Sequence, residues 1–172
     1  MIEKSTIQKV LAVFFDNPSR EFHLRELSRL LKLSMPTIIS ATDKLAKESL
    51  ILKKKGKVIT KVMANRSYID FARLKRLHNL ELIYKSGIMN HFSESYNQPK
   101  AIILFGSFSR GEDIEKSDID IAIITNKKLN LNLQKYENIL KKVISVHEVN
   151  LDKISKEFKS NLANGIVLEG SW

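Results

Sequence analysis

The sequence predicts an α+β protein in which a small helical domain and a domain built on a mixed sheet are joined by a long helix. Three features predict it. Apolar residues at helical spacing fill the first 48 residues and lead into a strand-turn-strand pattern. A second, longer helical pattern follows, and unbroken apolar runs typical of buried strands come after residue 100. We therefore place domains at residues 1–66 and 98–172, with a connector helix over residues 67–97.

Three helices are expected before residue 49. The first runs from Ser5 to Phe15, because its apolar residues recur at 3.6-residue spacing. A short second helix carries the leucines of residues 24–31. The third begins at Ser34, a residue type that caps helices well. Pro36 then falls in the first turn, where its missing N–H costs nothing.

A hairpin with a cationic tip is expected next. Residues 50–52 and 58–62 are predicted as two strands, and four lysines and Gly56 lie between them. Three helices followed by a basic hairpin resemble a winged helix-turn-helix, over about residues 1–64. The resemblance implies contact with duplex DNA through exposed residues of the third helix and the hairpin. These are Thr37, Ser40, Lys44, Lys53, Lys54, Lys55 and Lys57. The alternative is that the lysines form only a solvated turn.

Charge is distributed unevenly along the chain. Residues 1–96 carry 18 basic and 9 acidic side chains, a net charge of +9, whereas residues 97–172 carry 11 and 10, a net charge of +1. This asymmetry favours a polyanion-binding module in the first half. A generally lysine-rich composition explains the total of +10 equally well.

Composition excludes several classes of protein. The chain has no cysteine, which rules out disulfides and thiolate metal sites. No apolar run approaches the roughly 20 residues that cross a bilayer. The first ten residues are amphipathic and lack the apolar core of a secretion signal. We expect a cytoplasmic protein with no membrane partner.

The second domain is expected to hold three strands and two helices. Strands are predicted over residues 101–105, 118–124 and 143–149, and helices over residues 133–142 and 152–161. Residues 165–168 are predicted as a short final strand or turn. Sheet and helices together give a small mixed sheet flanked by helices.

The stretch over residues 104–123 carries the chemistry. Gly106 lets the chain turn sharply and approach a ligand, Ser107 and the N–H groups after it can bind phosphate oxygens, and Arg110 adds a permanent positive charge. Asp118 and Asp120 are two apart on a strand, so their carboxylates share a face and repel each other. Mg²⁺ or Mn²⁺ would remove that repulsion. Taken singly, the glycine and serine fit an ordinary turn, and the aspartates fit a helix cap or a structural Ca²⁺ site.

The pattern Gly106-Ser107, Arg110-Gly111 and Ser117-Asp118-Ile119-Asp120 resembles the minimal nucleotidyltransferases of the DNA polymerase β superfamily, over about residues 98–170. The resemblance implies that an NMP, expected to be AMP, moves from an NTP, expected to be ATP, to an acceptor hydroxyl. It also implies that the aspartates hold the metal, and that Gly106, Ser107, Arg110 and Ser117 bind the nucleotide. Some similar proteins are antitoxins that modify a partner toxin, so a small helical partner protein is expected.

The resemblance further implies a third carboxylate on a later strand, which completes the metal site and acts as general base. Glu148 is the candidate, because it shares a strand face with Ile144 and Val146 and ends that face. Asp152 is the alternative, although it fits better as the cap of the last helix. His147 is assigned as a partly exposed strand histidine, with a metal ligand or proton shuttle as the alternative.

A rival function comes from another class. The chain could be a DNA-binding transcriptional regulator whose second domain senses a nucleotide without turnover. Winged helices often dimerise, so a homodimer is expected under either function.

Overall fold

The computed structural model describes residues 4–56 and 59–172. The chain divides into two compact units, Met1–Leu74 and Lys75–Trp172, and passes from one to the other within helix α4 (Ile69–Ser86). No helix in the described residues is long and apolar enough to cross a membrane.

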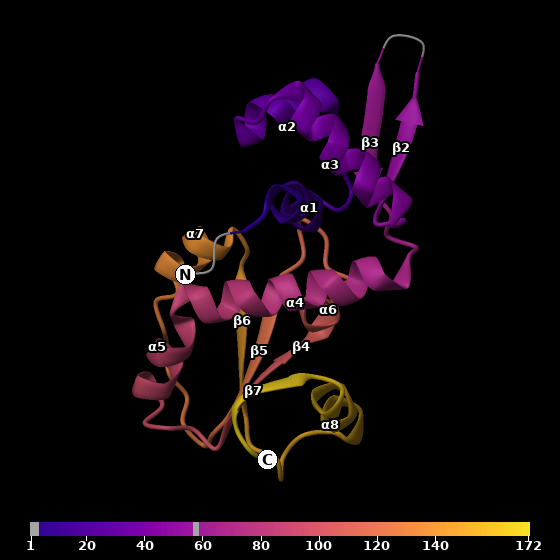
Figure 1. Cartoon of the computed structure of the whole chain (residues 1–172). Helices are drawn as coiled ribbons and strands as arrows, with labels where there is room; N and C mark the ends of the chain where they lie inside the picture. Colours follow the sequence, from indigo (N-terminus) through magenta and orange to yellow (C-terminus); the bar gives the residue numbers. More distant parts are fainter. Residues whose placement is uncertain (1–3, 57–58) are drawn as a thin grey trace. The chain divides into compact units, whose positions relative to one another are not determined.

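The first unit contains three helices and a hairpin in the expected order. Figure 1 shows strands β2 and β3 as the hairpin. Its elements are α1 (Thr6–Asp16), β1 (Glu21–His23), α2 (Leu24–Leu31), α3 (Met35–Lys47), β2 (Ile51–Lys55) and β3 (Thr60–Ala64). The predicted cap of the third helix is confirmed, because the Ser34 hydroxyl accepts a hydrogen bond from the Thr37 N–H at 3.3 Å.

Strand β1 was not expected from the sequence. It pairs antiparallel with β3, so the sheet has the order β1-β3-β2. Three residues are too few to show an alternating pattern, yet Phe22 is buried and packs edge-on against Phe14 at 5.7 Å. The core of the unit therefore includes one aromatic side chain from a strand that has no clear sequence signal.

The connector predicted as one helix over residues 67–97, with Gly87 as its candidate bend, is two helices. Helix α4 ends at Ser86 and α5 (Ile88–Ser95) follows after Gly87 alone. Gly87 has a φ of 78°, a left-handed conformation that glycine adopts without a Cβ penalty. The segment after Lys75 belongs to the second compact unit, where Ile83, Ile88 and Phe92 are fully buried.

The second unit is built on a four-stranded sheet of order β6-β5-β4-β7. Strands β4 and β5 pair antiparallel, as do β4 and β7, whereas β5 and β6 run parallel, so the sheet is mixed as predicted. The strands are β4 (Ala101–Phe105), β5 (Ile119–Ile124), β6 (Ile144–Val149) and β7 (Ile166–Gly170). Between β4 and β5 the chain forms a short unpredicted helix, α6 (Gly106–Arg110).

Each face of this sheet packs against its own helices. One face carries Ile102, Leu104 and Ile121, which pack with α5 and with the part of α4 after Lys75. Helix α7 (Gln134–Leu140) adds Leu140 to that core. The other face carries Ile103 and Phe105, and α8 (Lys156–Ala163) packs on it (Figure 1). Successive residues of a strand therefore lie in two different environments, because they alternate between the two faces of the sheet.

Candidate functional site

The Gly-Ser turn and the second aspartate lie side by side. Strands β4 and β5 pair so that Phe105 is opposite Asp120, and Gly106 begins α6 directly after Phe105. A Cβ placed on Gly106 would lie 2.2 Å from Asp120 Oδ2, and φ of Gly106 is 72°. Only glycine lets the backbone turn here against a carboxylate. The fold thus brings a strand-ending turn, whose first N–H groups have no acceptor within their helix, to one carboxylate of the aspartate pair.

The two aspartates differ in exposure. Asp118 immediately precedes β5 and is exposed, whereas the side chain of Asp120 is 31% exposed. The Ile119 N–H donates to the Val143 carbonyl at 2.9 Å, so the chain is held against β6 between the two carboxylates. Two acids two residues apart at a partly exposed sheet end can accept a hydrated cation.

A buried ionic network fastens the loop between α6 and β5. Asp113, 1% exposed in its side chain, accepts hydrogen bonds from Lys75 Nζ at 2.6 Å and Asn79 Nδ2 at 2.8 Å. Lys142 Nζ lies 3.3 Å from the other oxygen of Asp113 and donates to the Ile114 carbonyl at 2.6 Å. The loop that leads to Asp118 is therefore held in place by buried ion pairs.

This network was not predicted from the sequence. Its only sequence signal is a set of polar residues, Lys75, His78 and Asn79, at helical spacing on the face that also buries Phe71. A polar residue buried among apolar ones is expected to have a partner, but nothing in the chain order identifies Asp113 as that partner.

The other predicted nucleotide-binding residues have local partners. Arg110 Nε donates to Glu112 Oε2 at 2.7 Å, and both side chains are at least half exposed. The Ser117 hydroxyl accepts from the Ile114 N–H at 3.0 Å and so closes the loop before Asp118. Ser107 is the second residue of α6 and is partly buried. Gly106 lies against Asp120 and Ser107 follows it in α6, whereas Ser117 has a structural role in its own loop.

Glu148 does not face the aspartates, and the prediction that it converges with them is wrong. In the parallel pairing of β5 and β6, Asp120 is opposite Ser145, and Glu148 is opposite Ile123 on the other face of the sheet. There the Glu148 carboxylate accepts hydrogen bonds from the Tyr96 hydroxyl at 2.8 Å and the Leu129 N–H at 2.5 Å. Burial, followed by the hydrogen bond to Glu148, raises the pKa of the Tyr96 hydroxyl. Glu148 therefore holds Tyr96 and the loop after β5.

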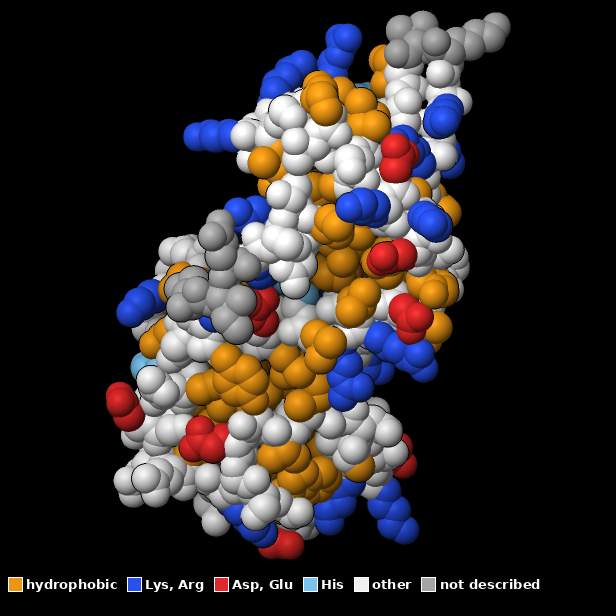
Figure 2. All heavy atoms as spheres, in the orientation of Figure 1, with side chains coloured by type: hydrophobic (Ala, Val, Ile, Leu, Met, Phe, Trp, Pro, Cys, Tyr) orange, Lys and Arg blue, Asp and Glu red, His pale blue; other side chains and the backbone are white. Residues whose placement is uncertain are grey.

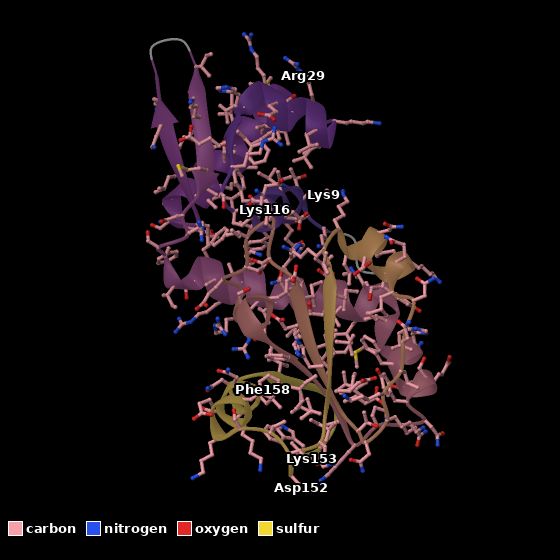
Figure 3. The ribbon with its side chains drawn as sticks, turned by 180° about the vertical axis from the view of Figure 1, so that it is seen from behind. Lys9, Arg29, Lys116, Asp152, Lys153 and Phe158 are labelled. Carbon is pink, nitrogen blue, oxygen red and sulfur yellow. The ribbon has the colours of Figure 1, made fainter. Side chains whose placement is uncertain are left out.

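Asp152 does not supply the missing carboxylate. Strand β6 runs parallel to β5, so residues after Val149 lie beyond the end of the sheet opposite to Asp118. Asp152 is exposed in the turn that follows β6, and Figure 3 labels it there. The predicted cap of the last helix is also wrong, because Ser155 caps α8 by accepting from the Phe158 N–H.

His147 takes the position where an acid was expected. It is opposite Ala122, on the same face of the sheet as Asp120, and its Nε2 atom lies 3.7 Å from Asp120 Oδ1. The imidazole packs edge-on against Phe105 at 5.2 Å and lies 6.0 Å from the ring of Phe158. Phe158 projects from α8 toward the sheet (Figure 3). The sequence offered His147 as a candidate, because successive residues of a strand face opposite sides of the sheet and His147 directly precedes Glu148.

The residues present suit one divalent cation held together with a substrate. Across the described ranges, no group of three or more histidine, cysteine, aspartate or glutamate side chains is placed so that it could hold a metal ion. Asp118 and Asp120 nevertheless offer the oxygen donors that Mg²⁺ and Mn²⁺ accept, and Mg²⁺ is commonly held by one or two carboxylates plus substrate phosphates. The donor set therefore fits a metal–nucleotide complex and does not include the expected third carboxylate.

The residues predicted to contact DNA differ in how exposed their side chains are. Lys53 is turned toward α3, where its Nζ donates to Asp43 Oδ1 at 2.7 Å, and its side chain is only 11% exposed. Lys54 is exposed and lies 3.6 Å from Glu21. Lys57 lies outside the described residues. The others are Thr37, whose hydroxyl contacts that of Ser34 at 2.7 Å, and the exposed Ser40, Lys44 and Lys55.

Thr37, Ser40 and Lys44 also line a surface hollow of about 540 Å³ together with the first residues of α1. Lysine and arginine side chains are spread over the visible face of the first unit (Figure 2). The first unit thus presents exposed cations near the hydroxyl groups of α3.

Residues 88–171 match the model of a protein family described as polymerase beta, nucleotidyltransferase. The matched segment runs from α5 into β7 and includes the Gly106 turn and both aspartates. It supports the polymerase β superfamily for this part of the chain, and nucleotidyl transfer as the general kind of reaction. Such enzymes typically use an NTP and a divalent metal. No curated protein matches the chain, and no solved structure matches it.

Proposed function

We propose that the unit Lys75–Trp172 transfers a nucleoside monophosphate from an NTP to an acceptor hydroxyl and releases pyrophosphate. The observation that supports this most strongly is the contact between the Gly106 turn and the Asp120 carboxylate. It joins a phosphate-binding turn to a metal-binding acid within the segment that matches the nucleotidyltransferase family. We propose ATP as the nucleotide, AMP as the group transferred and Mg²⁺ or Mn²⁺ as the ion.

The residues have distinct roles in this reaction. N–H groups of the Gly106-Ser107 turn and the Ser107 hydroxyl would bind the triphosphate, and the exposed Arg110 would exchange Glu112 for a phosphate oxygen. Asp118 and Asp120 would hold the divalent ion, which supplies charge neutralisation to the triphosphate and the leaving pyrophosphate. The acceptor oxygen attacks the α-phosphorus, the bond between that phosphorus and the α–β bridging oxygen breaks, pyrophosphate leaves, and the proton of the acceptor hydroxyl passes to water. Glu148 is assigned no part in these steps.

We propose that the acceptor is a hydroxyl on another protein. In the described part of the second unit there is a single sheet with its helices, and no second sheet that could enclose a small acceptor. A partner protein can present its own hydroxyl to an open site, which favours a partner of the kind modified by similar antitoxins.

Transfer of a labelled nucleotide tests the reaction. With α-labelled ATP, Mn²⁺ and a lysate or co-purified partner, we expect label on a protein, and at least about 100-fold less with Asp118→Ala. That factor corresponds to about 2.7 kcal/mol, within the several kcal/mol that a metal supplies. Asp152→Ala, which removes an exposed acid at the other end of the sheet, is the matched control and should keep wild-type transfer. Equal labelling by wild type and Asp118→Ala would contradict the assignment.

One observation favours the second candidate, a nucleotide sensor without turnover. The β6 side chain that approaches the Asp120 carboxylate is His147 and not an acid, so the general base expected from the resemblance is absent there. A sensor would bind ATP with Mn²⁺ and transfer no label to any candidate acceptor. Binding that depends on Asp118, without transfer, would support the sensor over the enzyme.

We further propose that the first unit is a winged helix-turn-helix that binds duplex DNA, with α3 and the β2–β3 hairpin as contacts. The sheet order β1-β3-β2 and the exposed cations support this proposal. Lys53 is a weaker candidate for a DNA contact than the other lysines, because it is hydrogen-bonded to Asp43. Helix α3 also carries few side chains that could recognise bases. Binding through phosphates with little sequence preference is therefore favoured.

Salt dependence of DNA binding tests this part. A Lys54→Gln/Lys55→Gln variant should bind a generic duplex more weakly, with the slope of log Kd against log salt reduced by about 0.9 for each lost phosphate contact. The control variant Lys156→Gln/Lys159→Gln removes two exposed lysines from α8 and should bind as wild type does. If the two variants bind alike, the hairpin is not a DNA contact.

A further inference from the structure

His147 is held at the aspartate site by apolar neighbours. The ring contacts Phe105 at 5.2 Å and lies 6.0 Å from Phe158, while the side chain keeps 42% of its surface exposed. Its parity on β6 directs it to the face of Asp120, and Nε2 approaches Asp120 Oδ1 to 3.7 Å. The rings of Phe105 and Phe158 thus hold the imidazole with its Nε2 atom directed toward the Asp120 carboxylate.

That nitrogen is left without a hydrogen bond. Nε2 is shielded from solvent and has no hydrogen-bond partner within the described part of the chain. A buried polar atom without a partner is unfavourable, because it has lost its hydrogen bonds to water and gained none in the protein. A direct imidazolium–carboxylate pair would remove this cost by closing to about 2.8 Å, the usual length of a charge-assisted hydrogen bond. At the observed 3.7 Å the two atoms are near each other but not hydrogen-bonded, so Nε2 remains available to a ligand.

The same separation suits two ligands of one metal ion. With metal–ligand bonds of about 2.1 Å, neighbouring ligand atoms of an octahedral ion lie roughly 3.0 Å apart. Nε2 and Oδ1 are about 0.7 Å further apart than this, a gap that a small side-chain rotation closes. The described residues hold no three such side chains already placed around one ion, so the exposed Asp118, two residues before Asp120, would have to turn toward the ion as it binds.

We propose that His147 is a third protein ligand of the divalent ion, beside Asp118 and Asp120, and that the site therefore binds Mn²⁺ in preference to Mg²⁺. The proposal rests on the proposed function and names the metal of that site. Mg²⁺ demands oxygen ligands, whereas imidazole nitrogen is a good ligand for first-row transition ions. A site with imidazole in place of one carboxylate also has less negative charge. This weakens the binding of Mg²⁺ more than that of Mn²⁺, because Mn²⁺ also bonds to the nitrogen.

Binding of Mn²⁺ to the whole chain tests the proposal without reference to turnover. Electron paramagnetic resonance of Mn²⁺ with ATP should show hyperfine coupling to a ¹⁴N nucleus of the protein, lost in His147→Ala. Competition by Mg²⁺ should show a Mn²⁺ preference that falls by roughly tenfold or more in His147→Asp, the scale on which even outer-shell groups change metal affinity. His23→Ala, which removes an exposed histidine of the first unit, should leave both results unchanged. Circular dichroism verifies that each variant is folded.

The possible results separate the inference from the proposed function. Mn²⁺ binding that depends on Asp120 but shows no ¹⁴N coupling would overturn the role of His147 and leave the aspartate site intact. Coupling that persists in His147→Ala would assign the nitrogen to another group, with the same consequence. Absence of Mn²⁺ binding, with and without ATP, would overturn both.

Discussion

Asp120→Asn is expected to weaken metal-dependent binding of ATP by roughly 100-fold. Asparagine keeps the shape of the side chain but removes its negative charge, and a bound metal contributes several kcal/mol, with 1.36 kcal/mol for each factor of ten. Asp120 is also the carboxylate that touches the Gly106 turn, so its charge is felt at the proposed phosphate site. Isothermal titration of ATP, with Mn²⁺ and with the ion removed by a chelator, measures the metal-dependent part.

The matched control for this experiment is Asp152→Asn, the same chemical change at an exposed aspartate beyond the far end of the sheet. It should bind ATP with the wild-type dissociation constant. A loss of affinity that is equal in the two variants would reflect net charge alone and would contradict a specific role for Asp120.

Asp113→Ala is expected to destabilise the second unit by about 3–5 kcal/mol. The substitution removes the carboxylate that accepts a hydrogen bond from the buried ammonium group of Lys75, and breaking a buried ion pair from one side carries a cost of this size. It also removes the acceptor of Asn79 Nδ2 and one contact of Lys142. Denaturant unfolding followed by circular dichroism should show an earlier transition for this unit.

Glu112→Ala is the matched control, because it removes the neighbouring acid, whose side chain is 57% exposed. Surface pairs of this kind contribute about 0–1 kcal/mol, so its transition should nearly coincide with that of the wild type. Lys75→Met combined with Asp113→Leu should recover part of the stability lost in Asp113→Ala, since both charges are then gone. If Asp113→Ala unfolds together with Glu112→Ala, the network does not stabilise the unit.

Most of the fold could be predicted from local patterns. The helices of the first unit and strands β4 and β5 lie where apolar spacing places them, because these segments bury one continuous stripe or both faces. Strand β1 was not predicted, and at Gly87, the candidate bend of the connector helix, the helix is interrupted. A strand of three residues carries no measurable period, and an isolated glycine in a helical pattern bends, breaks or leaves the helix intact according to its tertiary contacts.

The candidate site could be predicted only where its residues are close in sequence. Gly106 and the aspartate pair belong to one strand-loop-strand segment, so their meeting follows from local geometry. The contribution of β6 depends on its register against β5, and a shift of parity by one residue exchanges His147 for Glu148. Glu148 does share a strand face with Ile144 and Val146, as predicted, but that face is the one opposite to Asp120. The link between Lys75 and Asp113 spans 38 residues and has no local signature.

A crystal structure with Mn²⁺ and a non-hydrolysable ATP analogue tests the central claim most directly, because the anomalous signal of manganese locates the ion independently of the fitted side chains. We expect the anomalous peak within bonding distance of the Asp118 and Asp120 carboxylates, with the triphosphate against the N–H groups of Gly106 and Ser107. A peak bonded to neither aspartate, or a triphosphate bound away from the Gly106 turn, would contradict the proposed site.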